Sequence, residues 1–191
     1  LLIGVGIFSI AAGLTAVGRE QAIDTKRHVL ESTRGVQTRA HLEAEVLGDH
    51  RLETAAGAAH LEVIAEGVAP VLGELAGGAV IYRDAFPDTD VVHAAHGSRF
   101  EELRVLHSPK APTIARYHLK SAGKLRASRG TIEVVDGQGK VQLRSLPAFA
   151  IDAAGTKRAL DVRLDTSGSE PVMIARLDPA GLTYPITVDP T

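Results

Sequence analysis

The amino-acid sequence predicts a mainly β protein, with β-sandwich-like antiparallel sheets of short strands and an N-terminal apolar helical segment. Apolar and polar residues alternate with a period of two along several short runs, which is the pattern of strands with one buried face. These runs recur about every ten residues and turn residues separate them, as in all-β folds. Segments with helical periodicity are absent after the first third, which argues against an α/β fold.

The first segment, residues 1–17 (LLIGVGIFSIAAGLTAV), contains no charged side chain. Its small residues at 11–16 resemble the end of a signal peptide, although the basic start is missing. Seventeen apolar residues are also at the lower limit for crossing a bilayer. Three interpretations therefore stay open: an export signal, a membrane anchor in contact with the bilayer through residues 1–17, and a docking helix buried in a larger assembly.

The rest of the chain divides into a linker and a β-rich domain. Residues 19–33 mix charged and apolar side chains at helical spacing and predict a short linker helix. The period changes to two at residue 36, which predicts a strand over 36–46 and places the domains at 1–35 and 36–191. Further strands are predicted at 61–64, 79–82, 90–93, 101–106, 114–119, 131–135, 141–144, 148–151, 160–164, 172–177 and 184–188.

Four of the separators combine an Asp, which can cap a turn, with a Gly, which tolerates positive φ. They lie at residues 135–140, 152–156, 165–168 and 178–181. We expect each of them to join two strands as a hairpin. The most basic stretch, residues 120–129, is interpreted as a solvated hairpin end rather than a binding patch.

Composition excludes several classes of function. The 21 Lys and Arg residues against 23 Asp and Glu give a net charge of −2, so no broad positive field gathers nucleic acid. With four Phe, three Tyr and no Trp, the chain has few platforms on which bases could stack. The absence of cysteine excludes disulfides, Cys-ligated metals and a thiol nucleophile, and it is compatible with export through an oxidising compartment.

Asp84, Asp88 and Asp90 are the candidate metal ligands. Three carboxylates close together could bind calcium, but their spacing is not that of an EF-hand loop, and turn formation is the simpler interpretation. The calcium interpretation gives the alternative function, a calcium-dependent adhesive or ligand-binding domain.

Two pairs of charged or titratable residues also stand out. His93 and His96 lie at a predicted strand end, where their offset places them on opposite faces, and we interpret them as exposed loop histidines. Glu101 and Glu102 are adjacent and face opposite ways, so they cannot act as an acid/base pair. We expect one of the two glutamates to face a partner or a cationic neighbour.

No set of residues predicts catalysis. Ser98 and Ser108 lie beside histidines, but no Gly-x-Ser-x-Gly elbow accompanies them. A His/Asp pair around His93 is the remaining hydrolase hypothesis, and no motif supports it. The sequence therefore predicts a protein that is not an enzyme, with no catalytic residue and no cofactor.

Four short motifs point to one group of bacterial proteins. They are 77–82 (GGAVIY), 86–92 (FPDTDVV), 101–106 (EELRVL) and 184–191 (YPITVDPT). In this order they resemble the N-terminal β-rich region of Rhs/YD-repeat-type bacterial polypeptides and related large surface proteins. The resemblance covers about residues 77–191, and YD repeats themselves are absent from the chain.

The resemblance implies an exported module at the cell surface or outside the cell that accompanies a large shell or repeat array in toxin delivery or cell–cell contact. It does not imply catalysis, because activity in that group generally resides in a variable C-terminal effector. The expected function is therefore structural. The expected partner is a protein, namely another part of the same polypeptide or assembly.

Overall fold

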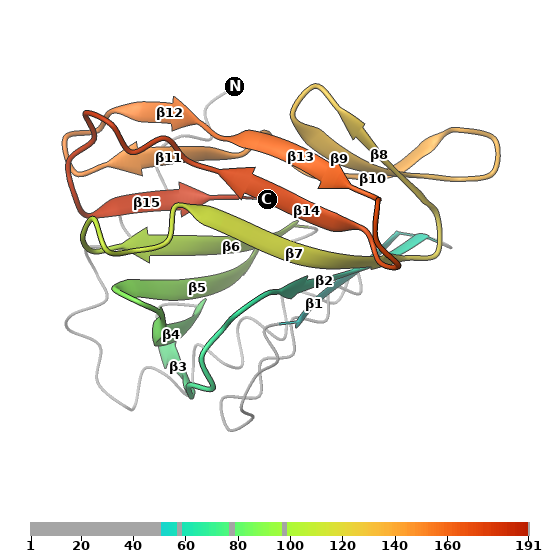
Figure 1. Cartoon of the computed structure of the whole chain (residues 1–191). Helices are drawn as coiled ribbons and strands as arrows, with labels where there is room; N and C mark the ends of the chain where they lie inside the picture. The colour runs from blue at the N-terminus through green and yellow to red at the C-terminus, as the bar shows by residue number, and fades with distance from the viewer. Residues whose placement is uncertain (1–50, 57–58, 77–78, 97–98, 191) are drawn as a thin grey trace.

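The computed structural model of the chain describes residues 51–56, 59–76, 79–96 and 99–190 (Figure 1). These residues form fifteen strands and no helix. The strands are β1 (Arg51–Ala56), β2 (Ala59–Ala65), β3 (Gly73–Ala76), β4 (Ala79–Phe86), β5 (Thr89–His96), β6 (Arg99–Leu106), β7 (Ile114–Ser121), β8 (Lys124–Ser128), β9 (Thr131–Val135), β10 (Val141–Arg144), β11 (Phe149–Asp152), β12 (Lys157–Ala159), β13 (Asp161–Asp165), β14 (Val172–Arg176) and β15 (Ile186–Asp189).

The strands form three sheets. Within each sheet, neighbouring strands pair antiparallel. A seven-stranded sheet has the order β12-β11-β15-β6-β5-β4-β3, and a five-stranded sheet has the order β1-β2-β7-β14-β13. A smaller sheet, β10-β9-β8, projects beside the five-stranded sheet (Figure 1). The prediction of a mainly β, antiparallel protein is thus confirmed, whereas the predicted helical segment within 1–35 and the strand at 36–46 lie outside the described residues.

The main core contains side chains from all three sheets. Leu106 of β6 and Ile186 of β15 are fully buried, and they belong to the same cluster as Tyr117 of β7 and Met173 of β14. Because alternate residues of a strand share a face, β7 contributes every second side chain, namely Ala115, Tyr117 and Leu119. The remaining buried members are Ala65, Ala111, Ile132, Ala148, Ala150, Leu160, Ala175, Leu177 and Val188.

Strands β4 and β5 differ from the expected pattern because both of their faces are buried. Ile81 and Val92 belong to one apolar cluster, and Val80 and Val91, on the opposite face, belong to another. All four side chains are less than 5% exposed. The continuous apolar run at 79–82 explains this, because a strand covered on both sides needs no polar face.

Three of the four Asp-Gly separators form the expected hairpins. Residues 135–140 join β9 to β10, residues 152–156 join β11 to β12, and residues 165–168 begin the longer loop that joins β13 to β14. The expectation of a hairpin at 178–181 is wrong, because β14 and β15 belong to different sheets. Turn chemistry determines only the local reversal of the chain; β15 instead pairs with β11 and β6.

The basic stretch at 120–129 has two parts. Lys120 and Ser121 are the last paired residues of β7, and the chain then moves to β8 in the smaller sheet. The hairpin interpretation is confirmed for the second part, where the two residues Arg129 and Gly130 connect β8 to β9. Among the described residues, no helix is long and apolar enough to span a bilayer.

The β8–β9 turn gives a testable prediction. Arg129 and Gly130 have φ values of 49° and 77°, as in a two-residue turn with positive φ at both positions. A side chain in this conformation costs about 1–2 kcal/mol, and Asn tolerates it better. We expect R129N to raise the free energy of unfolding by about 0.5–1 kcal/mol, as measured by urea denaturation.

R129A is the matched control because it removes the same charge and keeps a side chain in the strained conformation. We expect R129A to leave stability close to that of the original chain. Equal stabilisation by R129A and R129N would show that charge rather than backbone conformation governs this turn.

Candidate functional site

Four polar side chains form a buried cluster at the contact between the seven-stranded and five-stranded sheets. They are His93 of β5, Glu102 and Arg104 of β6, and Tyr117 of β7, and we call them the buried ion cluster. Glu102 and Tyr117 are fully buried, Arg104 is 3% exposed and His93 is 5% exposed. Charged side chains are rarely so deep unless they are paired, so this cluster is the first place to look for chemistry.

Strand register brings these side chains together. Glu102 and Arg104 are two residues apart on β6 and therefore share a face. His93 lies directly opposite Glu102 across the β5–β6 pair, where neighbouring side chains are close. Tyr117 reaches the same point from the other sheet, so the cluster joins the two layers.

The other three side chains of the cluster all contact Glu102. Arg104 donates from Nε to Glu102 Oε1 at 2.8 Å, and the Tyr117 hydroxyl donates to the same oxygen at 2.5 Å. His93 Nε2 lies 3.4 Å from Glu102 Oε2. The guanidinium of Arg104 also lies over the rings of Phe86 and Tyr117, 4.3 and 4.9 Å from their centroids, at cation–π distance.

The electrostatics of the cluster fix its charges. Burial by itself raises the pKa of Glu102, but the positive charge of Arg104 and the hydrogen bonds outweigh it and hold this pKa well below its ordinary value. Burial and the charge of Glu102 together raise the pKa of Tyr117 well above its ordinary value. At neutral pH, Glu102 is therefore ionised and Tyr117 is neutral. Neither group is poised to exchange a proton, which is what general acid–base catalysis requires.

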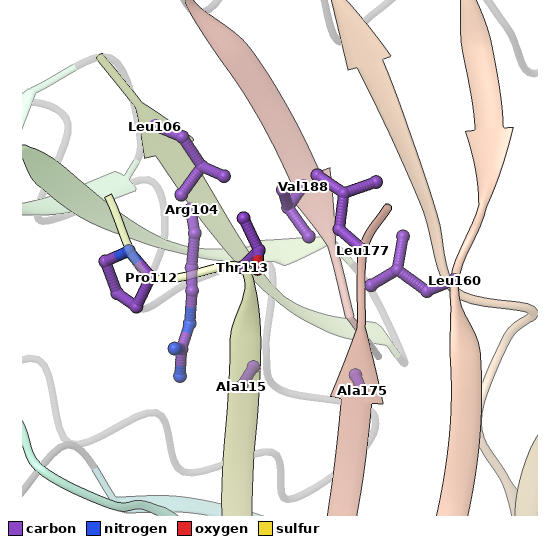
Figure 2. A pocket seen from close by; sticks show the side chains of 9 residues that line it. All are labelled: Arg104, Leu106, Pro112, Thr113, Ala115, Leu160, Ala175, Leu177 and Val188. Atoms are coloured by element: carbon purple, nitrogen blue, oxygen red, sulfur yellow. The ribbon is translucent and has the colours of Figure 1, made fainter. Parts of the chain in front are cut away.

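A small cavity lies beside the cluster (Figure 2). Arg104 lines it together with mostly apolar side chains such as Pro112, Ala115 and Leu177. Its volume of about 10 Å³ is close to what one water molecule needs. The Nη2 atom of Arg104 is buried and makes no hydrogen bond to the described residues, so this cavity suits a single water rather than an organic substrate.

The candidate calcium ligands lie at the other end of β4 and β5, around the bulge and turn that connect these strands. Asp90 Oδ1 accepts a hydrogen bond from the backbone N–H of Asp84 at 2.9 Å. Its Oδ2 accepts one from Arg83 at 2.9 Å and lies 3.2 Å from Nε2 of His107. Burial alone raises the pKa of Asp90, but these partners outweigh it and lower the pKa.

The other two aspartates occupy positions with unusual backbone conformation. Asp84 and Asp88 have φ values of 51° and 49°, which Asp tolerates better than most residues. Asp88 accepts a hydrogen bond from the hydroxyl of Ser108. Within the described ranges, no three His, Asp or Glu side chains are grouped so that they could hold a metal ion. The calcium interpretation stays a prediction from the sequence.

The structure separates the remaining candidate residues. The expectation that His93 is an exposed loop residue is wrong, because it lies within β5 and is buried on the inner face of the sheet. His96 also belongs to β5, whereas Ser98 lies outside the described residues. The expectation that one glutamate of the 101–102 pair faces a cation is confirmed by Glu102 and Arg104.

Sequence reasoning did not identify Arg104 and Tyr117 as members of the cluster. A signal for Arg104 was present, because residues 102, 104 and 106 share one face of β6 and the third of them is the apolar Leu106. An apolar residue in line with two charged ones indicates that the charges are buried as a pair. Nothing comparable identifies Tyr117, whose contact depends on how the two sheets pack.

The pairing of Glu102 with Arg104 predicts that substitutions at these two positions have strongly non-additive effects on the free energy of unfolding. E102Q leaves the buried cation of Arg104 without its counter-charge and should lower the free energy of unfolding by about 3–5 kcal/mol. The double variant E102L/R104M replaces both charges with apolar side chains and should recover most of this loss. Urea denaturation measures both values. A double variant that is as unstable as the sum of E102L and R104M would contradict the pairing.

The lowered pKa of Glu102 also predicts acid sensitivity. Its contribution to stability is complete above the ordinary value of 4.5 and decreases as the pH falls from there toward the folded-state pKa. The urea midpoint of the original chain should therefore decrease as the pH is lowered from about 5 to about 3, because the lowered pKa of Glu102 places its titration in and below this range. Because other carboxylates titrate there too, the comparison is with E102L/R104M, whose midpoint should fall less steeply. Equal slopes would exclude Glu102 as a source of the effect.

Comparison with known proteins does not place the buried ion cluster in a known family. No protein-family model, curated protein or solved structure matches the chain. The likeness to Rhs/YD-repeat-type polypeptides therefore stays a prediction from short motifs, and the function is argued from the residues.

Proposed function

We propose that this chain is a non-enzymatic, β-sandwich-like structural and interaction module of an exported bacterial surface or toxin-delivery polypeptide of the Rhs type. Its role is to dock to the rest of a larger assembly. The observation that carries this proposal is that the side chains of the buried ion cluster contact one another inside the core. There they join two sheets instead of facing a substrate.

The depth of the cluster supports a structural role. Glu102 has no exposed surface, and Arg104 is 3% exposed. A substrate would have to separate the two large sheets to reach the carboxylate, and the neighbouring cavity of about 10 Å³ offers space for no more than a water. The chemistry of the cluster therefore serves the register in which the two sheets pack.

The positions of the four short motifs support a single module. Residues 77–82 and 86–92 contribute to β4 and β5, residues 101–106 to β6, and residues 184–191 to β15. These four strands are consecutive neighbours in the seven-stranded sheet, in the order β15-β6-β5-β4. Motifs that are separated by up to about a hundred residues in the sequence thus lie side by side in one sheet.

The sheet edges offer places for docking. The chain passes directly from β12, at one edge of the seven-stranded sheet, to β13, at one edge of the five-stranded sheet, through Leu160. Among the strands that the structure describes, the two sheets finish at their other edges with β3 and β1. Unpaired backbone groups of an edge strand can accept a further strand from a partner.

Cell fractionation tests this proposal on the chain in its producing bacterium. We expect the protein outside the cytoplasm and, after crosslinking and gel filtration, in a complex larger than its own 20.1 kDa. A variant that lacks residues 1–17 should lose export or leave the complex, while its circular dichroism retains the β-sheet signal. A cytoplasmic, monomeric protein, or a truncated variant that behaves like the original chain, would contradict the proposal.

A further inference from the structure

The smaller sheet carries a pair of arginines that share one carboxylate. Arg126 of β8 donates to Glu133 Oε2 from Nε at 2.9 Å and from Nη2. Arg144 of β10 lies on the other side and donates to Glu133 Oε1 from Nε at 2.8 Å, with Nη2 at 2.6 Å. We call these two residues the arginine pair. Glu133 lies between them on β9 and aligns both guanidinium groups.

The register of the sheet creates this arrangement. Arg126 is the direct partner of Glu133 across the β8–β9 pair, and Arg144 is its partner across the β9–β10 pair. The three side chains therefore form one row on a single face. Glu133 is 2% exposed, whereas the side chains of Arg126 and Arg144 are 50% and 58% exposed. The arginines cover the carboxylate and present their own outer edges to solvent.

The arginine pair has donors to spare. Each guanidinium has five N–H groups, and Glu133 engages only Nε and Nη2 of each. Among the described residues, no contact uses the Nη1 group of either arginine. A second oxyanion could therefore bind at the exposed edge of the pair without displacing Glu133.

The surroundings of the arginine pair are positively charged. Residues 124–144 contain five Lys or Arg residues and two acidic ones, a local net charge of +3 in a chain whose net charge is −2. Lys124 lies two residues before Arg126 and thus on the same face of β8. One of the two acidic groups is Glu133 itself, and the other, Asp136, binds the backbone N–H groups of Gln138 and Lys140 in its own turn.

We propose that this face of the smaller sheet binds an extended acidic segment of a protein partner. Alternate side chains of an extended segment are about 6.6–6.8 Å apart, which matches the spacing of Lys124 and Arg126 along β8. Two carboxylates of such a segment can therefore meet the lysine and the arginine pair together. The positive patch is small and the chain as a whole is negative, so a short acidic peptide fits it better than a long polyanion, which needs a broad positive field.

Glu133 makes the arginine pair a preorganised binding site rather than a patch of mobile charged side chains. Two free arginine side chains would each lose conformational entropy on binding. Glu133 already fixes both, so less entropy is lost when a ligand arrives. The inference is independent of export and of the Rhs likeness, because it concerns binding by the purified chain.

Fluorescence anisotropy with a labelled hexaglutamate peptide at low salt tests the proposal. We expect saturable binding, and we expect R126Q and R144Q each to weaken it about tenfold. The matched control is R163Q, because Arg163 of β13 is also exposed and ion-paired, to Asp161 at 2.7 Å, and lies outside the smaller sheet. Equal losses for R163Q and the two site variants, or no binding by the original chain, would overturn the proposal.

The variant E133Q separates the effect of arginine alignment on peptide binding from the effect of net positive charge. This variant makes the patch more positive by one unit, so attraction by charge alone would tighten peptide binding. The proposal expects weaker binding, because the arginine pair loses the carboxylate that aligns it. Circular dichroism and urea denaturation of E133Q show whether the fold is retained, and tighter binding by a folded E133Q would overturn the proposal.

Two further probes identify the class of partner. Inorganic phosphate and vesicles that contain phosphatidylglycerol present oxyanions without an extended acidic backbone. We expect both to bind more weakly than hexaglutamate and to depend less on Arg126 and Arg144. Binding of vesicles that requires both arginines and exceeds peptide binding would assign the face to a membrane surface and reject the peptide.

Discussion

The carboxylate of Glu102 is the point on which the packing of the two larger sheets depends. It is contacted by side chains from three strands, namely Arg104, Tyr117 and His93. A shift of β6 by one residue would turn Glu102 outward and bury its neighbour, because successive side chains face opposite ways. Since an unpaired buried charge costs several kcal/mol, alternative registers are excluded. We therefore interpret the cluster as a constraint on register rather than as a source of net stability.

The same pairing of Arg with Glu serves two purposes in this protein. In the core, Arg104 is covered by the rings of Phe86 and Tyr117, and its charge stays inside. In the smaller sheet, Glu133 is the covered group and its two arginines face solvent. In the smaller sheet the buried carboxylate therefore holds two exposed arginines in place, whereas in the core both partners are buried.

Much of the fold follows from the sequence, because burial dictates the apolar pattern of most strands. The predicted boundaries of β9 and β10 agree with the structure. Strands β8 (KLRAS) and β12 (KRA) were not predicted, because their side chains carry little apolar signal and they are strands through pairing with neighbours. The site was harder to predict. Alternation predicted that one of Glu101 and Glu102 faces a partner or a cationic neighbour, without saying which. Tyr117 meets Glu102 only through the packing of two sheets, which sequence spacing does not encode.

The central position of β15 has a consequence for synthesis. This strand pairs with β6, eighty residues earlier, and with β11. At the usual translation speed, roughly 4–16 s pass between the emergence of β6 and that of β15. During this interval β6, and later β11 once it has been made, each have an open edge that can pair with another nascent chain. Aggregation on the ribosome, rather than weakness of the finished fold, is then the step expected to limit how much of this protein a cell can make.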